Sequence, residues 1–233
     1  MNILVTGASK GIGNAIAKEL FSLGDVFVTG RNENALKSCN AKDYCVCNLA
    51  QDIEVLTKFI KKNNIDVLIN NAGEYVYSGL ESMNVDDIQR LYQTNLIAPS
   101  ILASSAIPNM KEQKWGRIIN IGSISGVMGE AYASIYSSSK AGLIGLTKAL
   151  ALELAEFNIT VNTINPGWVE TELGMSSIDD SEFSREEVIE TIPQRRFVQP
   201  KEVAKLCEYL ISEDAKGITG QSINLCAGLS VGI

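Results

Sequence analysis

Short apolar runs alternate with amphipathic segments along the whole chain, and this alternation constrains its fold more than any other feature. Seven runs have the length and composition of buried strands: residues 2–6, 25–30, 43–50, 65–73, 117–122, 158–164 and 220–228. Segments with helical periodicity separate them. Strands that alternate with helices pair in parallel through right-handed crossovers. We therefore predict an α/β fold whose parallel sheet is covered by helices.

Length and charge limit the organisation and the partners. A chain of 233 residues with 45% hydrophobic content can build one sizeable core, and no linker, repeat or low-complexity segment divides it. We therefore predict a single domain over residues 1–233. The net charge of −7, with dispersed Lys and Arg, argues against nucleic acid or an anionic membrane as the partner. No apolar run approaches membrane-spanning length.

Histidine is absent, which excludes Ser-His-Asp and Cys-His catalysis and histidine-bearing metal sites. The cysteines are odd in number and lie mostly in apolar runs, so we expect buried thiols in a reducing compartment and no metal site: Cys39, Cys45, Cys47, Cys207 and Cys226. The opening MNILVTG lacks the basic lead of a signal peptide. We expect a cytoplasmic protein.

A glycine cluster joins the first apolar run to the first amphipathic segment. Gly7, Gly11 and Gly13 stand between residues 2–6 and the remainder of GIGNAIAKELFSLG. In such a strand-turn-helix unit, backbone amides at the helix start can face a pyrophosphate, and glycines allow close approach. The spacing is GxxxGxG rather than GxGxxG, so the usual dinucleotide fingerprint is not strictly met.

Arg31 follows the second run, where dinucleotide sites choose between a ribose hydroxyl and a ribose phosphate. An Asp or Glu there favours NAD, whereas a nearby Arg accommodates the extra phosphate of NADP. Lys10 can add a second positive charge. We predict NADP(H) rather than NAD(H). The alternative is that Arg31 is a solvated loop charge and Glu33 holds a ribose hydroxyl.

The most chemically suggestive group is Ser123, Tyr136 and Lys140. Ser123 follows a predicted strand, so its hydroxyl would lie at the strand's carboxyl end and could donate a hydrogen bond to a substrate oxygen. Tyr136 and Lys140 are one helical turn apart, with roughly 5 to 6 Å between their Cβ atoms. An ammonium at about 5 Å favours a phenolate by roughly 3 kcal/mol at an effective dielectric near 20. We predict that Lys140 lowers the pKa of Tyr136 unless burial cancels the effect, although such pairs also occur on solvated helices.

Asn95 lies four residues before Pro99 in a helical pattern over residues 84–110. Proline has no amide hydrogen to donate to the carbonyl four residues earlier. The Asn95 carbonyl is thus predicted to be free for water or a side chain, either as a relay station or as a plain kink. Further on, the polar residues 172–199, with one short helical pattern, are long enough to form a mobile lid.

Taken together, these motifs resemble the short-chain dehydrogenase/reductase family over essentially the whole chain. TGASKGIG, NNAG, Asn95, Ser123, YSSSK, PGWVET and ITGQ occur in the family's order and spacing. The resemblance implies a Rossmann-type, doubly wound sheet of seven parallel strands. It also implies a relay in which Tyr136 is the acid or base, Ser123 orients the carbonyl, Lys140 holds the nicotinamide ribose and lowers the tyrosine pKa, and the Asn95 carbonyl holds a water.

The same resemblance implies a set of cofactor-binding residues at the carboxyl ends of the strands. Beside Tyr136 and Lys140, the set comprises Gly7, Ser9, Lys10, Gly11, Ile12, Gly13, Arg31, Asn48, Leu49, Asn71, Ala72, Gly73, Pro166, Gly167, Val169 and Thr171.

Within the family, the chain looks most like the 3-oxoacyl-(acyl-carrier-protein) reductase branch. Asn48 departs from the usual Asp, and Cys226 and Ala227 depart from a usual Asp- or Asn-Gly-Gly. Carrier proteins are acidic, so a docking face should be basic. The candidates for that face are Lys111, Lys114 and Arg117, but the neighbouring helix ends in Glu153, Glu156 and Phe157, which do not add to it.

The expected function is NADP(H)-dependent reduction of a ketone, free or carrier-bound, or the reverse oxidation. Free ketones, sugars and secondary-metabolite intermediates are alternatives to a 3-oxoacyl thioester. A catalytically silent NADP(H) sensor is the alternative from another class. The resemblance further implies a homotetramer or homodimer formed through the helices of Asn84 and Tyr136.

Overall fold

The fold is built on one seven-stranded parallel sheet in the order β3-β2-β1-β4-β5-β6-β7. The structure is a computed structural model and describes residues 1–179 and 184–231. The strands are β1 (Asn2–Thr6), β2 (Asp25–Gly30), β3 (Asp43–Val46), β4 (Val67–Asn70), β5 (Gly116–Ile121), β6 (Ile159–Pro166) and β7 (Ser222–Leu225). The predicted α/β class, the strand number and the parallel pairing are confirmed.

The strands are apolar because helices cover both faces of the sheet. Every residue of β4, β5 and β6 is buried, as expected for a parallel sheet inside a doubly wound fold. The predicted third, fourth and last strands were too long at one or both ends. Apolar composition continues past the ladder there, because residues beyond the strand ends remain buried in loops, as Cys47 and Leu49 do.

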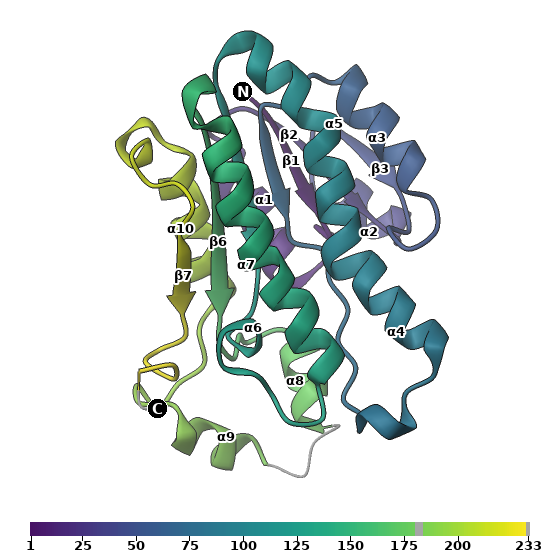
Figure 1. Cartoon of the computed structure of the whole chain (residues 1–233), viewed down its shortest axis with the longest axis vertical. Helices are drawn as coiled ribbons and strands as arrows, with labels where there is room; N and C mark the ends of the chain where they lie inside the picture. Colours follow the sequence, from purple (N-terminus) through teal and green to yellow (C-terminus); the bar gives the residue numbers. More distant parts are fainter. Residues whose placement is uncertain (180–183, 232–233) are drawn as a thin grey trace.

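Two layers of helices enclose the sheet (Figure 1). On one face, α1 (Gly11–Leu20), α2 (Glu33–Lys37) and α10 (Pro200–Ile211) bury Ile16, Leu36 and Cys207 in a common core. On the other, α3 (Ile53–Lys62), α5 (Ala98–Gln113) and α7 (Ser134–Leu154) bury Leu56, Leu102 and Leu154. All five cysteines are buried and free, in agreement with the expected thiols.

The predicted helix over residues 84–110 is interrupted. It consists of α4 (Val85–Tyr92), a π-helical turn (Gln93–Ile97) and α5, which runs on to Gln113. At the junction the Ala98 amide donates to the Gln93 carbonyl, five residues back. The wide turn precedes Pro99, which lacks an amide hydrogen for the α-helical ladder. The predicted irregularity is therefore present, as a π turn.

Small helices gather at the carboxyl ends of the strands, at the bottom of Figure 1. They are α6 (Ser125–Met128), α8 (Glu172–Asp179) and α9 (Arg185–Thr191). Ile178, Val188 and Phe197 form a separate apolar cluster there. The segment 172–199 thus holds two helices rather than the one predicted, and the part of the predicted lid at 180–183 lies outside the described residues. Over the described ranges 1–179 and 184–231, no helix is long and apolar enough to span a membrane.

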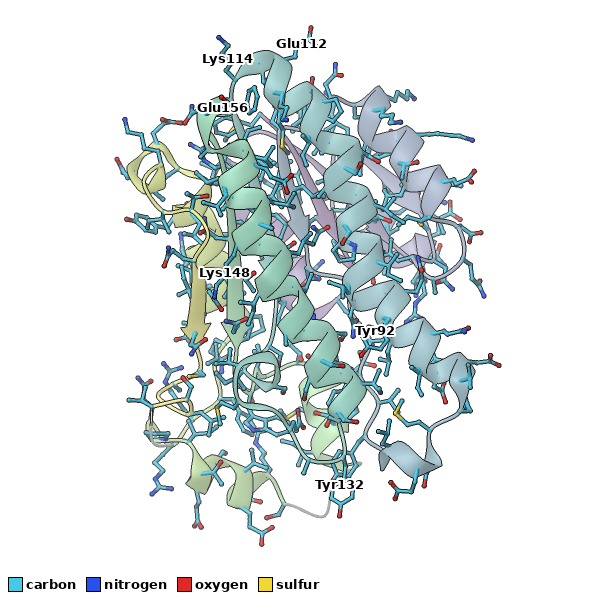
Figure 2. The ribbon with its side chains drawn as sticks, viewed as in Figure 1. Tyr92, Glu112, Lys114, Tyr132, Lys148 and Glu156 are labelled. Carbon is cyan, nitrogen blue, oxygen red and sulfur yellow. The ribbon has the colours of Figure 1, made fainter. Side chains whose placement is uncertain are left out.

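The predicted surface position of Arg117 is wrong. Arg117 is fully buried in β5, where it donates to the carbonyls of Gly116 and Asn158 and pairs with Glu213 at 3.2 Å. It therefore cannot contribute to a docking face. Lys114 lies at the end of the molecule opposite the strands' carboxyl ends, as Figure 2 shows.

Candidate active site

A cavity of ≈ 430 Å³ opens at the carboxyl ends of the strands, beside the point where the strand order reverses between β1 and β4. Doubly wound sheets bind ligands at such a point. Every predicted site residue lines this cavity except Gly13 and Asn95. The fold thus brings together residues from both halves of the chain, from Gly7 to Thr171.

The glycine turn is shaped so that backbone can approach a ligand and a neighbouring loop. Gly7 has φ +67°, a conformation that side chains rarely adopt. A Cβ on Gly13 would lie 2.4 Å from the Gly7 carbonyl oxygen and 2.4 Å from the Asn71 side-chain nitrogen Nδ2. Asn71 in turn donates to the Thr6 carbonyl at 2.8 Å, which fixes NNAG against the turn. With the start of α1 beside it, this cradle fits the pyrophosphate of a dinucleotide.

The two cations predicted for a ribose phosphate are both paired with carboxylates. Arg31 donates to Glu74 at 3.1 Å, and Lys10 pairs with Glu172 at 2.9 Å. Glu74 also accepts from Arg90 at 2.8 Å. The Arg31 and Lys10 side chains are mostly exposed, so a phosphate could replace their partners. The alternative ribose ligand, Glu33, instead pairs with Lys37 at 2.8 Å.

Tyr136 and Ser123 meet inside the cavity. Tyr136 lies in the first turn of α7 and lines the cavity together with Ser123, whose hydroxyl interacts with the phenol. Burial raises the pKa of Tyr136 to about 12. The interaction with the Ser123 hydroxyl opposes this rise, and the negative charge of Glu130 adds to it. The condition attached to the predicted effect of Lys140 therefore applies here: burial disfavours the phenolate and dominates the shift in the pKa of Tyr136.

Lys140 is 4% exposed and turns its Nζ to the carbonyl of Ile121, at 2.8 Å. The same Nζ is 5.8 Å from the centre of the Tyr136 ring. Burial lowers the pKa of Lys140 to about 8. A Cβ on Gly73 would lie 3.4 Å from this Nζ, so the glycine of NNAG leaves the room in which the lysine lies.

Asn95 does not line the cavity but clamps the wall behind it. Its side chain is fully buried, accepts from the Glu74 amide at 2.8 Å and donates to the Glu74 carbonyl at 2.9 Å. It also donates to Ser139 of α7 at 3.1 Å. The π turn therefore ties the segment after β4 to the helix of Tyr136, and the role of the Asn95 carbonyl toward water remains a prediction.

Several lining residues were not anticipated. Glu74 directly follows NNAG, and Glu130 lies between Ser123 and Tyr136, so their positions beside recognised motifs were the available signal. No local pattern marks the apolar residues of the cavity, which converge from separate loops. The residues missed include Glu74, Tyr75, Ser125, Met128, Glu130, Trp168, Leu173, Ser177 and Leu229.

Comparison with known proteins agrees with this geometry. A protein-family model described as "short chain dehydrogenase" matches residues 1–182. The 3-oxoacyl-(acyl-carrier-protein) reductase FabG of Rickettsia conorii is 39% identical over 232 residues, covering 97% of this chain and 95% of the relative. That of Aquifex aeolicus is 37% identical over 240 residues, covering 97% and 96%.

Among solved structures, a variant of actinorhodin polyketide ketoreductase, crystallised with NADPH, superposes with a TM-score of 0.91. The two are 34% identical, and the match covers 98% of this chain and 96% of the other. This chain belongs to the short-chain dehydrogenase family. It is an oxidoreductase that acts on C=O and CH–OH groups with a nicotinamide cofactor, which answers the alternative of a silent sensor.

Proposed function

We propose that the protein is an NADP(H)-dependent reductase that converts a ketone into a secondary alcohol, with Tyr136 as the proton donor. The observation that carries this proposal is that Ser123, Tyr136 and Lys140 line one cavity at the carboxyl ends of the strands. Burial also raises the pKa of Tyr136, which favours the protonated phenol. A protonated phenol is the form that reduction requires. The ketoreductase neighbour with NADPH and the cations Arg31 and Lys10 support NADP(H) as the cofactor.

The residues divide the chemistry between them. The glycine turn, NNAG and Lys140 would hold the dinucleotide, which supplies a hydride when bound. Ser123 donates a hydrogen bond to the substrate oxygen as negative charge develops there. Tyr136 gives its proton to that oxygen, and the Lys140 ammonium, one turn away, stabilises the phenolate left behind. The Asn95 carbonyl holds the water through which the phenol regains its proton.

The substrate side of the cavity favours a ketone with apolar flanks, because Met128, Trp168 and Leu173 line it. A 3-oxoacyl thioester is the first candidate, supported by the reductases named above. A polyketide-like or other secondary-metabolite ketone is the second, supported by the ketoreductase neighbour. We further propose that residues 172–199 close over the substrate and that the protein is cytoplasmic. We also propose that α4 and α7 mediate a homodimer or homotetramer, which light scattering would detect.

The decisive experiment measures NADPH oxidation against a panel of free ketones, sugars and 3-oxoacyl thioesters, the last with and without a carrier protein. We expect turnover with at least one member, and loss of turnover by 100-fold or more in Tyr136→Phe, in line with the usual worth of general acid catalysis. NADPH binding, followed by fluorescence, should persist in that variant. A wild type inert across the panel would contradict the proposal.

A further inference from the structure

A carboxylate enters the active site from the loop between α6 and α7. Glu130 is partly buried and lines the cavity. One of its oxygens accepts a hydrogen bond from the Ser125 hydroxyl at 2.6 Å, and the other accepts from the Tyr75 hydroxyl at 2.7 Å. Both bonds are short, as expected for donors to an ionised acceptor. The carboxylate is thus fixed by two side chains, Ser125 and Tyr75. We call these the two arms, because Ser125 contacts Ser123 and Tyr75 contacts Tyr136.

The first arm leads to Ser123. The Ser125 amide donates to the Ser123 Oγ at 3.1 Å, and the two hydroxyl oxygens are also 3.1 Å apart. Since the single proton of the Ser125 hydroxyl is directed to Glu130, its oxygen is left as an acceptor toward Ser123. Ser123 then holds its own proton as a donor, directed either to Ser125 or to a substrate oxygen.

The second arm leads to Tyr136. The ring of Tyr75 stands edge-on to the ring of Tyr136, with 4.9 Å between centroids and an interplanar angle of 80°. Because the Tyr75 hydroxyl is tied to Glu130, the loop that carries Glu130 also fixes this ring contact. The two arms end on Ser123 and Tyr136, whose hydroxyls interact at the reacting centre.

We propose that Glu130 is a positioning residue: through Ser125 it fixes the hydroxyl of Ser123 as a donor, through Tyr75 it braces the ring of Tyr136, and it places a negative charge beside that phenol. The proposal rests on the proposed ketone reduction for its kinetic consequences. Its structural content, an anion acting on Tyr136, stands without turnover.

The charge of Glu130 opposes ionisation of the phenol. Among the described residues, the ionisable groups that interact with Tyr136 are Lys140 from its own helix, Tyr75 from the segment after β4, and Glu130. Of these, Glu130 raises the pKa of Tyr136. Removing the charge should therefore lower that pKa, so that ketone reduction declines and alcohol oxidation rises at a lower pH.

The first test follows Tyr136 directly. The whole protein is produced with 3-fluorotyrosine, whose phenol is more acidic than that of tyrosine, and the ¹⁹F signal of Tyr136 is assigned with Tyr136→Phe. In Glu130→Gln we expect the titration midpoint to move down by about one pH unit. Glu54→Gln, an exposed carboxylate on α3, is the charge-matched control and should leave the midpoint unchanged. An unchanged or higher midpoint in Glu130→Gln would overturn the proposal, whether or not the protein reduces any ketone.

The second test separates positioning from charge. Ser125→Ala cuts the arm to Ser123 but keeps the carboxylate, so we expect kcat for reduction to fall about tenfold while KM for NADPH and the ¹⁹F midpoint stay near the wild-type values. A thermal melt checks that the variant is folded. Wild-type kcat in a folded Ser125→Ala would overturn the positioning role of Glu130.

Discussion

At the scale of single residues, Lys140 and Tyr136 show how burial competes with charge. The folded-state pKa of Lys140 is about 8, below its ordinary 10.5. Above pH 8 the folded protein therefore loses a proton that the unfolded chain still holds, and stability rises with pH until the unfolded lysine also titrates.

For the cofactor-free protein we expect the free energy of unfolding to gain about 2 kcal/mol between pH 8 and pH 10 from this lysine. Lys140→Met should lack the gain. Urea unfolding of both proteins at each pH measures the difference in unfolding free energy. If this free energy depended on pH in the same way in both proteins, the pKa of Lys140 would not be lowered in the folded state.

Arg31 makes a second residue-scale prediction, on cofactor choice. If its guanidinium binds the ribose phosphate, Arg31→Ala should lower kcat/KM for NADPH roughly tenfold or more, since a charge-assisted hydrogen bond is lost, and leave NADH little changed. Glu74→Gln, which removes the competing carboxylate, should act in the opposite direction. An NADPH preference that survives Arg31→Ala would refute the assignment.

At the scale of elements, the turn between β1 and α1 depends on contacts that only a glycine permits. Gly13→Ala would place a methyl carbon 2.4 Å from the Gly7 carbonyl oxygen, so the turn and NNAG must separate. We expect NADPH affinity to fall at least tenfold and the melting temperature to drop, because both features lie in one packed unit. Calorimetric titration and thermal melts measure the two effects.

Gly217→Ala is the matched control for this change. A methyl group there meets no atom within 4 Å, and the residue is exposed. It should leave both NADPH affinity and melting temperature near those of the wild type. Equal losses in the two variants would mean that the contact at Gly13 does not matter.

At the scale of the whole molecule, the net charge is −7. Of the carboxylates that line the cavity, Glu74 and Glu172 are paired with cations, whereas Glu130 is held by two hydroxyls. A free 3-oxo acid should therefore be a poorer substrate than its uncharged ester of equal chain length, and its kcat/KM should improve with added salt, which screens repulsion. Equal kcat/KM for acid and ester at low salt would contradict this expectation.

The position of the basic residues bears on delivery of a substrate. Lys114 lies at the end of the molecule away from the cavity, as Figure 2 shows, and Arg117 is buried. Lys111 is stacked at 4.4 Å on Phe157. A carrier protein docked on that face would hold its cargo far from Tyr136, so any carrier must approach the end where α6, α8 and α9 gather.

The prediction from sequence succeeded where the signal was local. The glycine turn, NNAG and the Tyr136 helix were found because their structure follows from neighbours in the chain, and their lining of one cavity follows from parallel pairing. It failed for Arg117, which was assigned to a basic docking face because of its charge, since its partner Glu213 is distant in sequence. Glu130 and Tyr75 escaped notice for the same reason, since they meet only in space.

The sequence by itself determined the parallel α/β fold, the family and the candidate catalytic side chains, because periodicity, turn chemistry and motif spacing act over short stretches of chain. Only the tertiary structure decided the ionisation of Tyr136 and Lys140, the pairing of Arg31 with Glu74 and the place of Glu130. Those properties depend on desolvation and on distances between residues from separate loops, and both quantities exist only once the chain has folded.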